Sequence, residues 1–134
     1  MNLPNGAVVV VADGEKLLMF HNKGLESHVE LVAMPKPDFD LANAGSGSRH
    51  HSSSSNPDGG RKAEDNFASS TAGYLNRQVL EGKVEHMLII ADPRTLGELR
   101  KHFHVALEPK LIGQIAKDLT GHSIEQIQTA IANN

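Results

Sequence analysis

The chain has 134 residues, of which 39% are hydrophobic and only 4% aromatic, with no cysteine and a formal net charge of −3. This length predicts a single domain, residues 1–134, whose core is built from aliphatic side chains. The lack of cysteine excludes disulfides, thiolate metal sites and a cysteine nucleophile, and the slight negative charge excludes a uniformly basic surface for nucleic acid.

The first part of the chain predicts antiparallel strands. The β-branched run Ala7–Ala12 is typical of a strand buried on both faces. Asp13-Gly14 separates it from the apolar run Lys16–Phe20, and this dipeptide predicts a tight hairpin because both residues tolerate positive φ. His28–Met34 alternates partially between apolar and polar residues and indicates a third strand near an edge of the sheet, ended by two prolines.

A long loop is predicted from about residue 38 to residue 62. Its sequence is rich in serine and glycine and has almost nothing to bury. It therefore cannot offset the entropy of its own ordering, and we expect it to be flexible. Loops of this length inside a compact domain usually carry a function or are disordered.

Helical periodicity follows the loop. Ala63–Glu81 carries apolar residues on one face, and Gly73 within it would permit close approach to the sheet. Gly82 fits the position just after a helix. His86–Ala91 then predicts another buried strand.

The last third of the chain predicts two capped helices around an ambiguous segment. Asp92-Pro93 is typical of a helix cap and first turn, opening a helix from Arg94 to about His104. Leu111–Leu119 fits a helix slightly better by periodicity, but a twisted edge strand is the alternative. A capping box starting at Ser123 opens a final helix that runs through Ile131.

Several segments together resemble one family. The bacterial proteins known as host attachment proteins, or proteins required for attachment to host cells, share them and are similar to the middle domain of archaeal and eukaryotic class I release factors and of Pelota. The resemblance covers nearly the whole chain. It implies a three-layer, ribonuclease-H-like α/β fold with a mixed five-stranded sheet whose second strand is antiparallel, and it makes Leu111–Leu119 the fifth strand. The segments that carry it are Val9–Gly14, Gly59–Arg61 followed by Phe67-Ala68, Ala91–Arg100 and Lys117–Thr120.

The resemblance also singles out Gly59-Gly60-Arg61. In release factors a Gly-Gly-Gln tip enters the peptidyl-transferase centre, where glycine permits close backbone approach and the glutamine orients water. Arg61 stands at the glutamine position, and a permanent cation suits phosphate better than a neutral water, which argues against peptidyl-tRNA hydrolysis. The alternative is an ordinary flexible loop before a helix. The residues of the loop that would contact RNA phosphates are Arg49, His50, His51, Gly59, Gly60, Arg61 and Lys62.

A second cationic group lies on the predicted helix after Pro93. Arg94, Arg100 and Lys101 would form a small basic face for RNA or a protein partner, although a solvated helix face is the commoner explanation. The adjacent histidines at 50 and 51 lack the spacing of a metal site.

Three aspartates invite comparison with metal-dependent nucleases. Asp13 follows the first strand, where ribonuclease-H-like nucleases hold a metal. A turn explains Asp13 and a helix cap explains Asp92, whereas Asp118 has no evident partner. We therefore predict no catalytic residue, no metal and no cofactor.

We expect a non-catalytic binding protein that contacts the ribosome or tRNA. The alternatives are a factor that acts directly or indirectly in attachment to host cells without binding RNA, and a weak peptidyl-tRNA hydrolase. A protein partner is possible in either binding role, and no small-molecule substrate is evident. The start of the sequence shows no basic leader, and Ala7–Ala12 is too short to span a membrane, so we expect a cytoplasmic protein, with signal-free export left open.

Overall fold

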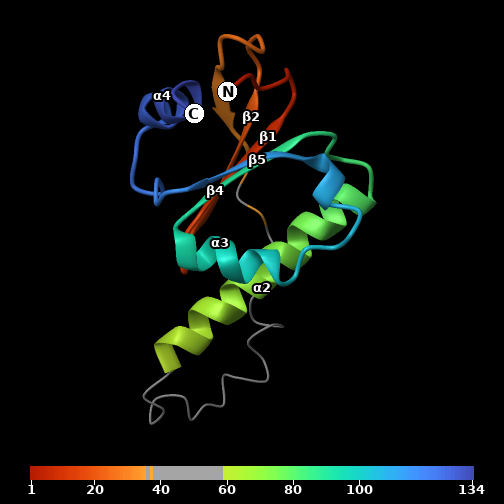
Figure 1. The fold of residues 1–134 in the computed structure, drawn as a ribbon, viewed down its shortest axis with the longest axis vertical. Helices are drawn as coiled ribbons and strands as arrows, with labels where there is room; N and C mark the ends of the chain where they lie inside the picture. Colours follow the sequence, from red (N-terminus) through yellow and green to blue (C-terminus); the bar gives the residue numbers. More distant parts are fainter. Residues whose placement is uncertain (36, 38–58) are drawn as a thin grey trace.

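The computed structural model describes residues 1–35, 37 and 59–134 (Figure 1). The predicted loop over residues 38–62 lies outside the described residues as far as residue 58. The elements in chain order are β1 (Val8–Ala12), β2 (Leu17–Asn22), β3 (Leu31–Ala33), α2 (Gly59–Leu80), β4 (Met87–Ala91), α3 (Pro93–Arg100), the 3₁₀ turn η2 (Glu108–Lys110), β5 (Leu111–Ala116) and α4 (Ile124–Ala132).

The strands form one five-stranded sheet in the order β3-β2-β1-β4-β5. β2 is antiparallel to both β1 and β3, whereas β4 is parallel to β1 and to β5. This is the mixed sheet with an antiparallel second strand that the resemblance implied, so the predicted fold is confirmed. The predicted third strand is shorter than expected, with three residues at one edge of the sheet.

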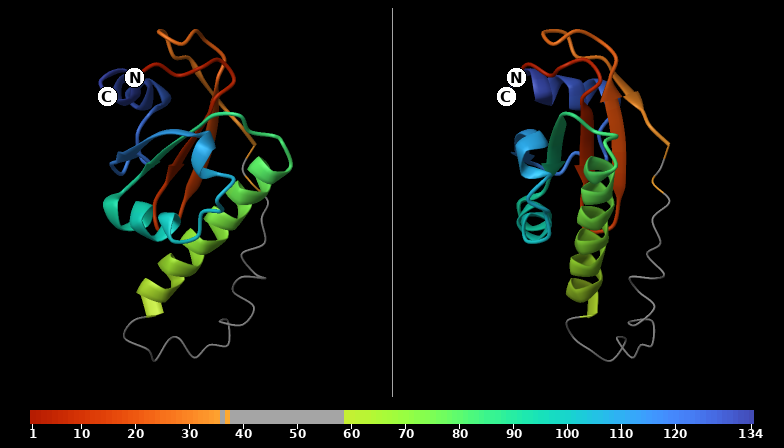
Figure 2. Two further views of the ribbon diagram at one scale, coloured as in Figure 1. Left: turned by 45° about the vertical axis from the view of Figure 1, so that its right-hand side comes forward. Right: turned by 90° about the vertical axis from the view of Figure 1, so that its right-hand side faces the viewer.

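The sheet is buried on both faces because its central strands are apolar at every position. Val8, Val10 and Ala12 face one core cluster with α2 and α3, whereas Val9 and Val11 face a second cluster with α4. The result is three layers, and the prediction that β1 is buried on both faces is confirmed. α4 and both termini lie at one end of the molecule, and the start of α2 extends past the other end (Figure 2).

The β1–β2 turn differs from the prediction. Gly14 does not have a positive φ. Instead one carboxylate oxygen of Asp13, Oδ1, accepts the backbone N–H groups of Glu15 at 2.7 Å and Lys16 at 2.6 Å. The side chain of Asp13 thereby supplies the bonds that close the turn, which removes the need for a left-handed backbone.

α2 begins earlier than predicted, at Gly59 instead of Ala63. Gly59, Gly60, Arg61 and Lys62 are therefore the first residues of a helix and not the end of a loop. Adding a residue to an existing helix costs far less than starting one, so the helix continues upstream from its anchored part in spite of the glycines. Among the residues of α2 whose burial is described, from Ala63 onward, Phe67 is the first that is buried, and we call Gly59–Asn66 the overhang.

Two glycines, one within α2 and one just after it, differ in what they do. Gly73 is exposed and nothing lies within 4 Å of the place that a Cβ would take, so the expected close approach to the sheet is wrong. Gly82 has φ +75° and ends the helix as predicted. Its N–H bonds to Val79 O and the N–H of Lys83 bonds to Gln78 O, which is the Schellman pattern.

The capping predictions for the last two helices are confirmed. The Asp92 side chain accepts the N–H of Thr95, and Pro93 follows as the first helical residue of α3. α3 ends at Arg100, however, and not near His104. At α4, Ser123 and Gln126 cap each other's backbone in a capping box.

The fifth strand that the resemblance placed at Leu111–Leu119 is present, against the helical periodicity, but it ends at Ala116. Met87 pairs with Leu111 but Leu88 pairs with Gly113, so Ile112 is an extra residue in β5. Such a bulge places two consecutive residues on one side of the strand. This shift makes the apolar residues of β5 fall at a spacing that resembles a helix.

Candidate functional site

A cleft of about 460 Å³ lies where the parallel strands end. Asp13 directly follows β1, Asp92 directly follows β4, and Asp118 comes two residues after β5. Because parallel strands present their carboxyl ends at the same edge of a sheet, these three aspartates converge. The cleft is lined by Asp13, Gly14, Glu15, Glu64, Asp65, Ala68, Asp92, Arg94, Thr95, Glu98 and Asp118.

A threonine connects two of these aspartates. The Thr120 hydroxyl lies 3.0 Å from Asp13 Oδ2 and 2.8 Å from Asp118 Oδ1. Burial raises the pKa of Asp13, but the hydrogen bonds from Glu15, Lys16 and Thr120 outweigh that effect, so the pKa of Asp13 is lowered overall. Asp118, which has no partner evident in the sequence, is thus bonded within its own turn.

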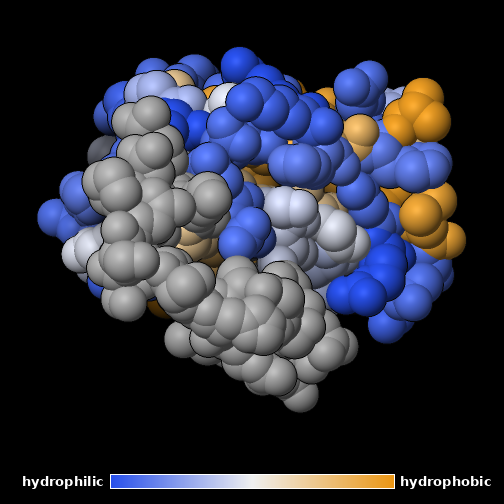
Figure 3. Space-filling model, turned by 90° about the horizontal axis from the view of Figure 1, so that it is seen from below, coloured by the Kyte–Doolittle hydropathy of each residue, from blue (hydrophilic) through white to orange (hydrophobic). Residues whose placement is uncertain are grey.

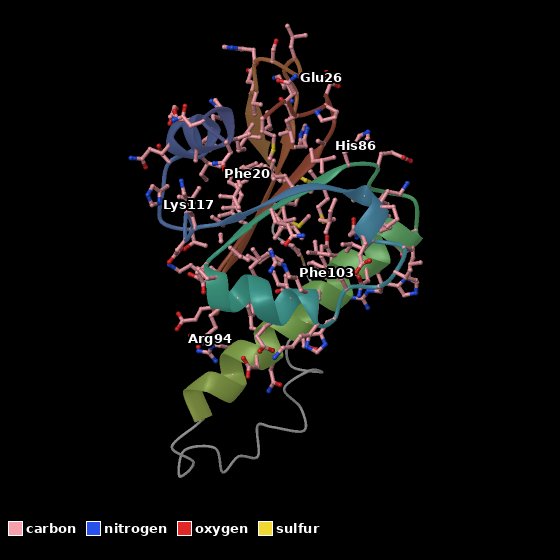
Figure 4. The ribbon with its side chains drawn as sticks, viewed as in Figure 1. Phe20, Glu26, His86, Arg94, Phe103 and Lys117 are labelled. Carbon is pink, nitrogen blue, oxygen red and sulfur yellow. The ribbon has the colours of Figure 1, made fainter. Side chains whose placement is uncertain are left out.

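Arg94 connects α3 with the first half of α2. Its Nη1 lies 2.6 Å from Glu64 Oε1 and its Nη2 lies 3.3 Å from Asp65 Oδ1. Figure 4 shows Arg94 reaching from α3 toward the first half of α2. A Cβ on Gly14 would approach the Glu64 side chain to 2.8 Å, so the β1–β2 turn also contacts this point. The base of the overhang is therefore held between α3 and the β1–β2 turn.

Two further acids of the cleft also have structural partners. Asp92 caps α3, and Glu98 lies 2.8 Å from Lys101 Nζ. The hydrogen bond from Lys101 lowers the pKa of Glu98, and the same bond raises the pKa of Lys101. The turn and cap roles expected for Asp13 and Asp92 are confirmed by these bonds.

This arrangement is a set of anchored carboxylates around a single arginine. Within residues 1–35, 37 and 59–134, no group of three or more His, Cys, Asp or Glu side chains could hold a metal ion. The acids that line the cleft outnumber its one cationic residue, Arg94. A negatively charged cleft repels phosphate, so RNA would not enter it without neutralisation.

The sequence-predicted binding residues fall into three places. Arg49, His50 and His51 lie outside the described residues. Gly59, Gly60, Arg61 and Lys62 are the first residues of α2, at the start of the overhang.

The three cations of α3 and its C-cap do not share one face. Arg94 and Lys101 pair with acids around the cleft. Arg100 lines a different groove, where its Nε donates to Gln114 Oε1 at 2.7 Å. The basic face predicted on this helix is thus divided, and two of its charges are paired, because helical geometry turns position 100 away from positions 94 and 101.

Sequence reasoning treated the cleft acids one at a time and missed their convergence. The available signal was that each aspartate follows a strand that the α/β pattern makes parallel. No comparable signal existed for the ion pairs of Arg94, since they join residues 30 and 29 positions apart.

The coloured part of the face seen from below is mostly hydrophilic, with apolar side chains gathered toward one side of the view (Figure 3). The exposed large hydrophobic residues of the described chain are Leu25, Leu80 and Val105. None of the described helices has the length and apolar character needed to cross a membrane.

Comparison with known proteins adds one finding. A family model described as bacterial archaeo-eukaryotic release factor family 12 matches residues 6–131. The search among curated proteins found no match.

Proposed function

Because the chain belongs to the bacterial archaeo-eukaryotic release factor family 12, we propose that it acts in translation as a binding protein that contacts the ribosome or tRNA through the start of α2. The observation that carries this proposal is the overhang. It spans about 12 Å from Gly59 to Phe67, at 1.5 Å per residue. The Gly-Gly-Arg sequence therefore stands at the most remote point of a helix whose other end is anchored in the core.

The chemistry of these residues supports contact with phosphate. Arginine stays protonated at physiological pH and carries five N–H donors in a fork that fits a phosphate group. The two glycines at the helix start carry no side chain that would hold an RNA backbone away. A helix start also presents backbone N–H groups that lack partners within the helix.

The acidic cleft confines the proposed contact to the tip. The overall charge of −3 and the carboxylates at the base of the overhang disfavour a broad RNA interface. We therefore expect few phosphate contacts and a shallow dependence of binding on salt. With one or two contacts, the slope of log K against log salt is only about −1 to −2.

Co-sedimentation with ribosomes tests this proposal. Arg61→Ala should weaken binding about tenfold, because a charge-assisted hydrogen bond contributes ~1.5 kcal/mol. Arg77→Ala is the matched control, because Arg77 is an exposed arginine at the anchored end of the same helix. Absence of binding at low salt, or equal loss for the two variants, contradicts the proposal.

Two alternative functions are separated by further measurements. A weak peptidyl-tRNA hydrolase would release peptide from a loaded ribosome, and we expect the wild-type protein to release none, because Arg61 does not position a neutral water as glutamine does. A factor for attachment to host cells would show an adhesion defect on deletion. If ribosome binding and adhesion are both lost in Arg61→Ala, the adhesion defect follows from the role in translation.

A further inference from the structure

The two edges of the sheet are protected to different degrees. β3 is an edge of three residues that is followed by Pro35. β5 is the opposite edge, with six residues and neither a charge nor a proline in Leu-Ile-Gly-Gln-Ile-Ala. Natural sheets usually protect an edge with charges, proline, brevity or a bulge, because an exposed edge pairs readily with another strand, and of these β5 has the bulge at Ile112. No described strand occupies the outer edge of β5.

A groove runs along this edge and carries opposite charges at its two ends. Its volume is about 450 Å³. Arg100 lies at the Gln114 end, where its Nε donates to the Gln114 side chain. Glu108 lies at the other end, next to the start of β5, and forms no hydrogen bond or ion pair with another described residue through its side chain. Both charged residues are exposed. The groove is lined by Arg100, Phe103, Glu108, Leu111, Ile112, Gly113 and Gln114, with Phe103 labelled in Figure 4.

The bulge gives residues 111–114 of β5 a symmetric order of faces. Leu111 packs against the core cluster beneath α2 and α3, and Gln114 bonds to Arg100 of α3 on that same side. Ile112 packs against the opposite cluster, and a Cβ on Gly113 would meet Leu88 of that cluster. The side chains of residues 111–114 thus have the same order of faces whether the strand is read forward or backward.

We propose that the outer edge of β5 is a dimer interface that takes the β5 edge of a second copy in antiparallel orientation. A two-fold axis between Ile112 and Gly113 keeps every side chain on its own face, since the order of faces is the same in both directions. The same axis brings the Arg100 end of each groove to the Glu108 end of the other. An ion pair between Arg100 of one copy and Glu108 of the other therefore forms twice, once at each end of the interface.

A second copy is favoured over a foreign strand for two reasons. β5 is already extended in each copy, so pairing orders no free chain and saves the entropy that a flexible peptide would lose. The charges of the groove are complementary to their own two-fold image, which an unrelated strand would match only by carrying both signs at the same spacing. With only the groove residues in contact, the interface is small and we expect dissociation constants on the order of micromolar or weaker.

A charge-reversal cycle tests the dimer in the full chain. Analytical ultracentrifugation over a concentration series gives the dissociation constant of the wild type, Arg100→Glu, Glu108→Arg and the double variant. Each single reversal should weaken association by about tenfold or more, because symmetry places the like-charge contact at both ends. The double variant should recover the wild-type constant, which a merely structural effect of either change would not produce.

Hydrogen exchange locates the contact independently. Amides of β5 should become more protected as the protein concentration rises, whereas amides of the β3 edge should not change. A chain that stays monomeric at all concentrations overturns the proposal and leaves the edge to a strand of another protein. The proposal is also overturned if the amides that become protected in the dimer belong to β3, or if neither charge reversal changes the dissociation constant. Ribosome binding by the overhang is not involved in either measurement.

Discussion

Replacement of the buried Asn22 by alanine should be among the most destabilising single changes outside the apolar core. Asn22 ends β2 and is fully buried. Its Nδ2 donates to Leu3 O at 2.7 Å, and its Oδ1 accepts the N–H groups of Gly24 at 2.8 Å and Glu30 at 2.9 Å. One side chain thus connects the N-terminal segment, the turn after β2 and the approach to β3.

The expected cost follows from these three bonds. Each contributes about 1 kcal/mol, so their loss amounts to about 3 kcal/mol. Water can reach the freed amides of Gly24 and Glu30, which belong to a partly exposed and an exposed residue, but the Leu3 carbonyl belongs to a fully buried residue and stays unsatisfied. We therefore expect Asn22→Ala to lower the free energy of unfolding by about 2–4 kcal/mol.

Urea unfolding followed by circular dichroism measures this change. Asn5→Ala is the matched control, because Asn5 is exposed and its Nδ2 donates one bond, to Gly24 O at 2.8 Å. That variant should lose less than about 1 kcal/mol. If Asn22→Ala loses no more than Asn5→Ala at equal m-values, Asn22 does not hold these three segments together and the reasoning fails.

Four further changes test other parts of the structure. Gly73→Ala should raise the free energy of unfolding by about 1 kcal/mol in urea titrations, because the helix gains propensity and the added methyl meets nothing. Gly82→Ala should lower it by about 1 kcal/mol, because φ is +75° there, so two identical substitutions in one helix region should have opposite signs. The pKa of Asp13 is lowered in the folded state from its ordinary value of 3.8. The Asp13 carboxylate therefore stabilises the fold at a pH above 3.8, and this contribution is lost as the pH falls through the lower folded pKa. Asp13→Asn should therefore show a smaller loss of thermal stability than the wild type on acidification below that value, and equal losses would refute the assignment. Arg94→Ala should speed hydrogen exchange in residues 59–66 while leaving the end of α2 unchanged, since Arg94 pairs with Glu64 and Asp65 at the base of the overhang.

Much of the fold could be predicted because local signals and burial agree. The run Ala7–Ala12 is apolar at every position, and the structure buries β1 on both faces. Asp92-Pro93 and the Ser123 capping box marked helix starts that the structure reproduces, since a cap depends on neighbouring residues alone. β5 was harder, because the extra residue Ile112 broke the alternation on which strand prediction depends.

The site was predicted less well because its geometry depends on distant contacts. The sequence predicts a loop at Gly-Gly-Arg, since glycine is unfavourable in helices, whereas the anchoring of α2 at Phe67 is a tertiary effect. Charge alone grouped Arg94 with Arg100. Only the packing of α2 beside α3 shows that Arg94 pairs with acids while Arg100 lines a separate groove.

The overhang has a consequence for how this protein diverges among its relatives. If the proposed partner contacts the start of α2, selection by that partner should act most strongly before position 64, since Phe67 is the first buried residue among those of α2 whose burial is described. One turn further along the helix the pattern of substitution should change. Glu64 and Asp65 form ion pairs with Arg94, so substitutions at these three positions should occur together. A set of related sequences should therefore show independent drift before position 64 and paired changes just after it. The boundary between the two patterns would mark where the proposed contact at the start of α2 ends.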